Sequence, residues 1–155
     1  MTTIRAVVET SLPPERALKA AYDFSERRER IWPAVSTKRL QVHSEKEAEA
    51  EVTEGTRAGP IVNWERCRYD WSQPSSVKAI VTDSNVYQPW ASSWELKATA
   101  EGADSRVEMI WAREFKRGPR GRLFGFLFGT IGERIFNKYA RDVLKNLEKL
   151  EGELP

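Results

Sequence analysis

The sequence has very few of the side chains on which metal sites and nucleophilic enzymes commonly depend. It holds one cysteine, Cys67, and one histidine, His43, in 155 residues. A single cysteine excludes an internal disulfide, and one cysteine with one histidine cannot form a zinc site of Cys and His ligands. A Ser/His/Asp or Cys/His triad would have to use His43. We therefore expect no metal and no other cofactor.

Phosphate-binding motifs and a strong charge imbalance are also missing. The sequence contains no P-loop, no GxGxxG motif and no EF-hand spacing. Its 25 basic and 23 acidic side chains leave a formal net charge of +2. This charge is too small for electrostatics alone to drive tight binding to nucleic acid or to an anionic membrane. We expect no nucleic-acid partner.

Long hydrophobic runs are absent as well. The longest apolar run, residues 123–131, is about half of the roughly 20 residues that a membrane-spanning helix needs. The first ten residues lack the basic and apolar regions of a signal peptide. We expect no transmembrane segment and a cytoplasmic protein.

Aromatic side chains, by contrast, are abundant. Six Trp, four Tyr and six Phe occur in a chain that is 40% hydrophobic and 31% charged. This composition is typical of a globular protein rather than a disordered one, and the length suits a single domain covering residues 1–155.

Hydrophobic periodicity predicts an α+β order. A strand is expected at 4–10, and Pro13, Pro14 and Glu15 suit the start of a helix that extends to residue 24. A second short helix, 26–31, should stop before Pro33. Alternating patterns with turn residues between them then predict six strands of an antiparallel meander: 37–44, half-buried; 45–54, exposed; 61–72; 77–84; 91–100; and 106–115. The chain should turn at 55–60 and end in one long helix, 121–150, covered by a curved sheet.

The expected C-terminal helix carries an unusual face. Large side chains occupy its second half, whereas Gly125, Gly129 and Gly132 occupy the same face of its first half. Each glycine costs about 1 kcal/mol relative to Ala in a helix interior. Either the helix approaches the sheet closely there, or the missing side chains leave a cavity for a ligand.

The inward faces of the strands combine aromatic with polar residues. Alternation directs Trp94, Met109, Trp111 and Arg113 inward, and on 61–72 it favours the face that holds Asn63, Glu65, Cys67, Tyr69 and Trp71. A buried charge needs a partner, so an ion pair between Glu65 and Arg113 would account for both residues. Alternatively, Arg113 orients a carbonyl or carboxylate of a bound ligand.

Other candidate sites have simple structural explanations. His43 falls on the polar face of its strand, which favours a solvated histidine over a general base, and Cys67 suits a small buried side chain. Lys116, Arg117, Arg120 and Arg122 form a basic cluster that is either a solvated loop or an anion contact. Leu123, Phe126 and Leu127 would face water unless a loop, a partner, a lipid surface or a second subunit in a homodimer covers them.

Several of these segments together resemble the START-like, helix-grip (SRPBCC) superfamily, in its polyketide cyclase/dehydrase and lipid-transport branch. The residues that carry the resemblance cover nearly the whole chain: Leu12-Pro13-Pro14-Glu15, Ile31-Trp32-Pro33, Trp64-Glu65-Arg66, Tyr69-Asp70-Trp71, the strands of Trp94 and Trp111, and the helix from Gly121. The resemblance implies a bent antiparallel sheet of six or seven strands that grips the C-terminal helix. It also implies an apolar cavity between them for lipids, sterols or polyketides.

We therefore expect the chain to bind a hydrophobic small molecule in an internal cavity. The residues expected to line it are Glu65, Tyr69, Trp94, Met109, Trp111, Arg113, Gly125, Phe128 and Gly129. An enzymatic alternative is polyketide cyclisation or dehydration, with Glu65 as base and Arg113 as oxyanion partner. A third possibility is a protein-interaction module that uses the outer Leu123, Phe126 and Leu127 patch.

Overall fold

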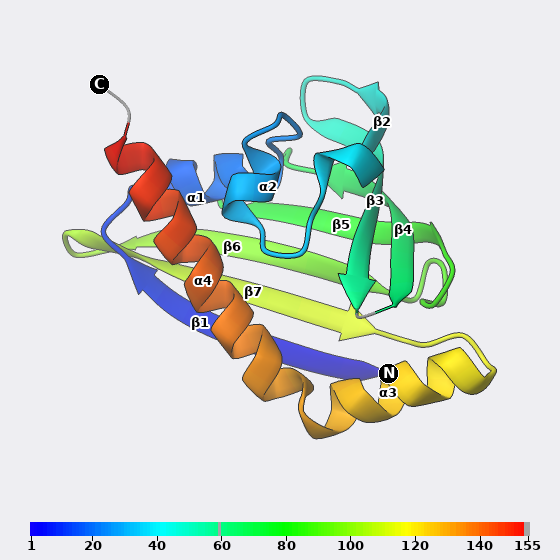
Figure 1. Cartoon of the computed structure of the whole chain (residues 1–155). Coiled ribbons are helices and arrows are strands. Elements are labelled where there is room, and N and C mark those ends of the chain that lie inside the picture. The colour runs from blue at the N-terminus through cyan, green and yellow to red at the C-terminus, as the bar shows by residue number, and fades with distance from the viewer. Residues whose placement is uncertain (59, 154–155) are drawn as a thin grey trace.

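A seven-stranded antiparallel sheet wraps around a long C-terminal helix (Figure 1). The computed structural model describes residues 1–58 and 60–153. Along the sheet the strand order is β1-β7-β6-β5-β4-β3-β2. The strands are β1 (Thr2–Thr10), β2 (Gln41–Glu45), β3 (Glu49–Ala58), β4 (Ile61–Asp70), β5 (Ser76–Ser84), β6 (Ser93–Glu101) and β7 (Asp104–Arg113). The helix-grip α+β fold predicted from the sequence is confirmed.

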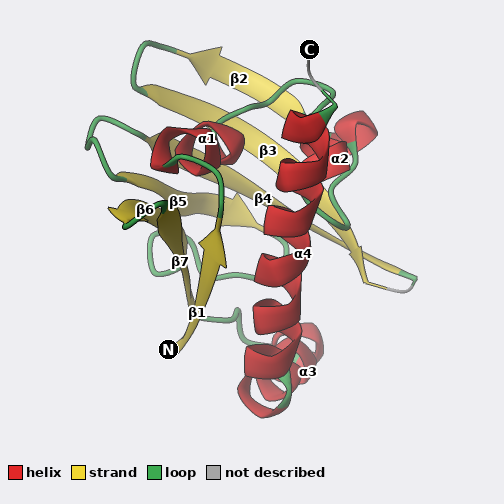
Figure 2. Ribbon diagram, turned by 90° about the vertical axis from the view of Figure 1, so that its left-hand side faces the viewer, coloured by secondary structure: helices red, strands yellow, loops and turns green. Residues whose placement is uncertain are grey.

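Four α-helices and one 3-10 turn complete the described chain. The two short helices α1 (Pro14–Ala21) and α2 (Arg28–Ile31) follow β1, and the turn η1 (Thr37–Arg39) precedes β2. After β7 come α3 (Pro119–Thr130) and α4 (Gly132–Gly152). Figure 2 shows α4 lying across the sheet, with α1 and α2 near its C-terminal end and α3 at the other end.

The core lies between α4 and the concave face of the sheet. Its helical side consists of Ala140, Val143, Leu144, Leu147 and Leu150, all buried. Strands β6 and β7 contribute the inward residues that alternation predicts, including Leu96, Val107 and Met109. On β4, Asn63, Cys67 and Tyr69 are buried while Trp64 and Arg68 face outward, so the face chosen for this strand is confirmed.

The segment before β3 departs from the prediction. The expected half-buried strand 37–44 begins with η1, and every residue of β2 is exposed, Val42 included. Strand β2 lies at the edge of the sheet, where β3 is the only strand it pairs with in the described chain. The strand expected at 45–54 was predicted to be exposed, but Ala50 and Val52 of β3 are buried. The turn predicted at 55–60 is wrong at its start, because β3 continues to Ala58. Residue 59 of that turn lies outside the described residues.

The single C-terminal helix predicted over 121–150 is in fact two helices. The chain changes direction at Ile131, so α3 does not lie along the sheet (Figure 1). Gly132 follows the break at the point where α4 meets β1, and a Cβ there would come within 2.8 Å of Ile4 Cδ1. Gly132 therefore allows a close helix-to-sheet approach. Gly129 is exposed and faces open space instead.

Alanine substitutions at Gly121 and Gly129 of α3 should change the free energy of unfolding in opposite directions. A Cβ on Gly121 would lie 1.7 Å from the Lys116 carbonyl oxygen, so we expect Gly121→Ala to lower the free energy of unfolding by about 1–3 kcal/mol. A Cβ on Gly129 meets nothing within 4 Å, and Gly129→Ala should raise it by about 0.5–1 kcal/mol. Urea unfolding of both variants measures the difference. Stabilisation by both would refute the close approach at Gly121.

Candidate functional site

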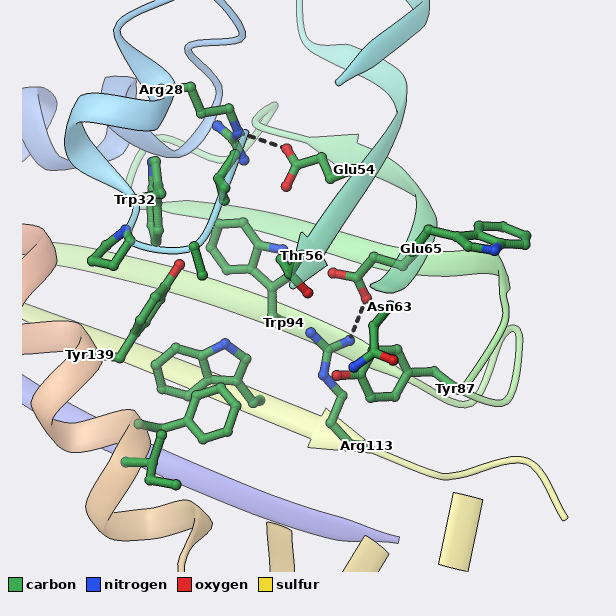
Figure 3. Close-up of a pocket in the computed structure, with 17 residues that line it drawn as sticks. Arg28, Trp32, Glu54, Thr56, Asn63, Glu65, Tyr87, Trp94, Arg113 and Tyr139 are labelled. Carbon is green, nitrogen blue, oxygen red and sulfur yellow. Dashed lines mark hydrogen bonds and ion pairs between the residues drawn. The ribbon is translucent and has the colours of Figure 1, made fainter. Parts of the chain in front are cut away.

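A pocket of about 320 Å³ opens on the concave side of the sheet, between β3, β4, α4 and the loop after α2 (Figure 3). Its size is near the lower end of the roughly 300–1,000 Å³ typical of small-molecule sites. Pro33, Ala34 and Val35 of the loop lie at its edge together with Ile135 of α4. Ile135 is 51% exposed, so the pocket communicates with solvent beside this residue.

One wall of the pocket is aromatic. Trp94 of β6 and Trp111 of β7 contribute from the sheet, Trp32 from the end of α2, and Phe136 and Tyr139 from α4. Their ring centroids lie 4.6 Å apart for Trp111 and Phe136 and 5.7 Å apart for Trp32 and Trp94. Such tilted ring contacts hold large apolar surfaces in fixed positions. This wall offers a flat or ring-shaped ligand several π-faces.

The opposite end of the pocket is polar. Arg113 Nη1 lies 3.2 Å from Glu65 Oε2, and the guanidinium carbon lies 4.4 Å from the centroid of the Tyr87 ring. Arg113 is 5% exposed and Asn63, beside it in Figure 3, is 8% exposed. Two atoms here, Arg113 Nε and Asn63 Oδ1, have no hydrogen-bond partner among the described residues. Since buried polar atoms are normally paired, a ligand group that both accepts and donates would complete this end.

Burial changes the pKa of the carboxyl group at the polar end of the pocket. Burial disfavours the charged form and so raises the pKa of the Glu65 carboxyl above its ordinary value. The attraction of Arg113 offsets only part of that rise. The negative charge of Glu54, the register partner of Glu65 on β3, contributes to the same rise. A carboxyl with a raised pKa beside a fixed cation can accept or return a proton nearer neutral pH than an exposed glutamate.

A second buried ion pair, Arg28 with Glu54, lines the pocket beside the aromatic wall. Arg28 Nε lies 2.6 Å from Glu54 Oε1, and Arg28 is only 2% exposed. Arg28 also donates hydrogen bonds to the carbonyl oxygens of Ala21 and Asp23 and to the Tyr69 hydroxyl. The Tyr69 hydroxyl in turn donates to Glu54 Oε1 at 3.3 Å. This network ties α2 to β3 and β4 and fixes one boundary of the pocket.

The structure brings four of the nine predicted residues together around the pocket and places the others outside its lining. The four are Glu65, Trp94, Trp111 and Arg113. Tyr69 does not line the pocket but hydrogen-bonds to Arg28, which does. Met109 is buried in the hydrophobic core between the sheet and α4. Gly125, Phe128 and Gly129 are on α3, outside the pocket lining, because the chain turns at Ile131. The idea that glycines of one long helix open the cavity is therefore wrong.

Both interpretations proposed for Glu65 and Arg113 are compatible with the geometry. The two residues form the ion pair that the inward charges required, and the pair faces the pocket rather than a sealed core. Sequence reasoning missed Arg28, Glu54 and Tyr87. Arg28 lies among several arginines of residues 27–30, and nothing in that run distinguishes the one that points inward.

The candidates with simple structural explanations behave as expected. His43 is exposed and bonds to Thr53 Oγ1 at the sheet edge, while Cys67 is buried and its thiol pKa is raised by burial. In the described part of the chain, no cluster of three His, Cys, Asp or Glu side chains could hold a metal ion. Nor does any helix there have the length and apolar character required to span a membrane.

Comparison with known proteins agrees with this fold. Residues 1–150 match the family model described as polyketide cyclase/dehydrase and lipid transport. A search of curated protein sequences found no match.

Solved structures with the same fold share little sequence with this chain. A Thermus thermophilus protein is 17% identical with a TM-score of 0.76, and the match covers 99% of this chain and 100% of the other. The Zhui aromatase/cyclase from a Streptomyces species is 11% identical with a TM-score of 0.77, covering 96% and 94%. A START superfamily protein from Mycobacterium smegmatis is 11% identical with a TM-score of 0.73, covering 96% and 98%. The chain belongs to the polyketide cyclase/dehydrase and lipid transport family.

Proposed function

We propose that this protein binds a small hydrophobic molecule with an aromatic or polyketide-like body in the pocket beneath α4. The observation that carries the proposal is the division of the pocket into an aromatic wall and a polar end with two unpaired atoms. Such a division suits a ligand with a ring-shaped apolar body and one group that accepts a hydrogen bond from Arg113 and donates one to Asn63. A volume of about 320 Å³ favours a compact ligand over a diacyl lipid.

Tryptophan fluorescence offers a direct test of binding. Trp32, Trp94 and Trp111 line the pocket with their rings, so an occupying ligand should change their emission. We expect a saturable change on titration with at least one member of a panel of polyphenols, fatty acids and sterols. Hydroxylated aromatic compounds should bind more tightly than their methylated counterparts, which cannot donate to Asn63. The absence of a saturable response to every compound would count against the proposal.

A second candidate function is cyclisation of the bound molecule, and the position of Glu65 favours it. The carboxylate would remove a proton from a carbon between two carbonyl groups, while Arg113 hydrogen-bonds the resulting enolate oxygen. The enolate carbon would then attack a ketone carbon of the same chain, and the new alkoxide would take the proton back from Glu65. One carbon–carbon bond forms in this isomerisation, and a following loss of water would give the unsaturated ring.

We expect Glu65→Gln to abolish turnover of a short poly-β-ketone while the variant still binds the compound. Glutamine keeps the size and a hydrogen-bonding oxygen but cannot take the proton. Glu51→Gln, at a half-buried carboxylate of β3 that does not line the pocket, is the matched control and should leave turnover intact. Equal rates for Glu65→Gln and the wild type would rule out Glu65 as the base and leave the binding function standing.

A further inference from the structure

A continuous apolar stripe is exposed along α3 and the first turn of α4. It comprises Leu123, Phe126, Leu127, Ile131 and Ile135. The backbone hydrogen bonds from Ile131 to Leu127 and from Ile135 to Ile131 keep these side chains one turn apart across the helix break. Phe126 is 66% exposed, and the five residues are half of the large hydrophobic side chains exposed in the described chain. An apolar surface of this kind marks an interaction site.

Basic side chains flank the part of the stripe that lies on α3, and acidic ones are missing from that part; Glu133 lies in the first turn of α4. Lys116, Arg117, Arg120 and Arg122 lie just before Leu123. Between Glu114 and Glu133 the sequence contains no Asp or Glu. Lys116 Nζ donates a hydrogen bond to the Ser84 carbonyl oxygen, whereas Arg117, Arg120 and Arg122 are exposed. A chain with a net charge of only +2 therefore places three exposed positive charges beside this apolar segment. The small net charge of the whole chain argues against purely electrostatic membrane binding. The charge of the surface around α3 is nevertheless clearly positive.

The fold orients this surface outward and connects it to the pocket. Phe128, on the inner side of α3, packs against Phe115 and Phe136 and holds α3 in place. Figure 2 shows α3 at the end of α4 that is far from α1 and α2. Leu123, Phe126 and Leu127 on its outer side are exposed. At the other end of the stripe, Ile135 lines the pocket while it is still half exposed.

We propose that α3 and the start of α4 dock on an anionic lipid bilayer, with the stripe inserted among the acyl chains and the basic cluster at the headgroups. Phe and Leu on one side with Arg and Lys beside them are the composition of helices that lie in a membrane interface. Each basic residue near an anionic surface strengthens such binding, and the apolar residues supply the remainder. Docking in this orientation brings the pocket edge at Ile135 to the membrane, where an apolar ligand can enter without crossing water. The proposal does not depend on the identity of the ligand.

Co-sedimentation with vesicles tests the proposal on the complete chain. We expect binding to phosphatidylcholine vesicles that contain phosphatidylglycerol, and much weaker binding to phosphatidylcholine alone. Arg120→Gln with Arg122→Gln should weaken binding to the anionic vesicles about tenfold or more, and added salt should reduce wild-type binding similarly. The control pair Lys78→Gln with Lys97→Gln removes two exposed charges from β5 and β6 and should have little effect.

Phe126→Ser separates insertion from charge attraction. It should weaken vesicle binding at least about tenfold, whereas Trp90→Ser, at a residue 63% exposed in the β5–β6 loop, should not. Equal binding to neutral and anionic vesicles, no binding to either, or equal losses for Phe126→Ser and Trp90→Ser would each overturn the proposal. So would sedimentation showing a dimer that Phe126→Ser dissociates, because the stripe would then be a subunit contact. Ligand titration without vesicles is a separate readout, so failure here leaves the pocket proposal untouched.

Discussion

Replacement of Arg28 by methionine is expected to lower the free energy of unfolding by about 3–5 kcal/mol, because the substitution leaves Glu54 buried without a partner. The side chain of Glu54 is 11% exposed and its closest cation is Arg28 at 2.6 Å. Methionine also leaves the carbonyl oxygens of Ala21 and Asp23 without the donor that now reaches them. Urea unfolding followed by circular dichroism measures the change.

Arg30, on the same short helix, provides the matched control. Its ion pair with Glu153 is 2.7 Å long, but both side chains are about half exposed. Exposed pairs contribute about 0–1 kcal/mol, so Arg30→Met should have a small effect. Adding Glu54→Leu to Arg28→Met should recover part of the loss, because an apolar pair can replace a buried ionic one. Similar losses for Arg28→Met and Arg30→Met would show that the network does not stabilise the fold.

Arg113→Met should make stability strongly dependent on pH. Burial already raises the pKa of Glu65 above 4.5, and removal of the cation 3.2 Å away raises it further. A carboxyl whose pKa is higher in the folded than in the unfolded state contributes stability below its unfolded pKa. That contribution is lost as the pH rises through the folded pKa. We therefore expect a loss of about 3 kcal/mol at pH 8 that shrinks steadily as the pH falls toward 4.5.

Unfolding of Arg113→Met in urea at several pH values between 5 and 8 checks this expectation. The double variant Arg113→Met with Glu65→Gln removes the titrating group and should lose most of the additional pH dependence. A loss in the single variant that is the same at pH 5 and pH 8 would mean that Glu65 is not the group responsible.

Local alternation was sufficient to predict much of the sheet and the pocket residues Glu65, Trp94, Trp111 and Arg113. Trp94, Trp111 and Arg113 lie on strands whose other face carries charged residues, Glu95 and Lys97 on β6 and Arg106 and Glu108 on β7, so a period of two fixes their direction toward α4. The pairing of Arg113 with Glu65 followed from the cost of burying either charge alone. These inferences needed only information within a strand and a general energetic rule.

The helix break and the Arg28 network depended on contacts between distant parts of the chain. The apolar run before Ile131 is equally compatible with a straight helix, and the close approach at Gly132 involves Ile4 at the opposite end of the sequence. Arg28 meets Glu54 and Tyr69 only after α2 has folded onto the sheet. Contrary to the prediction, Gly125 and Gly129 do not lie on the inner face of a long helix, because α3 turns away from the sheet.

Isothermal titration of a pocket-filling variant tests the central claim most directly. Thr56 of β3 lines the pocket, and Thr99 of β6 is exposed outside it. With the tightest ligand from the fluorescence panel, Thr56→Phe should weaken binding at least about tenfold by occupying ligand volume, while Thr99→Phe should bind as the wild type does. Equal affinities for the two variants, or no saturable heat with any compound, would contradict the assignment of this pocket as a ligand-binding site.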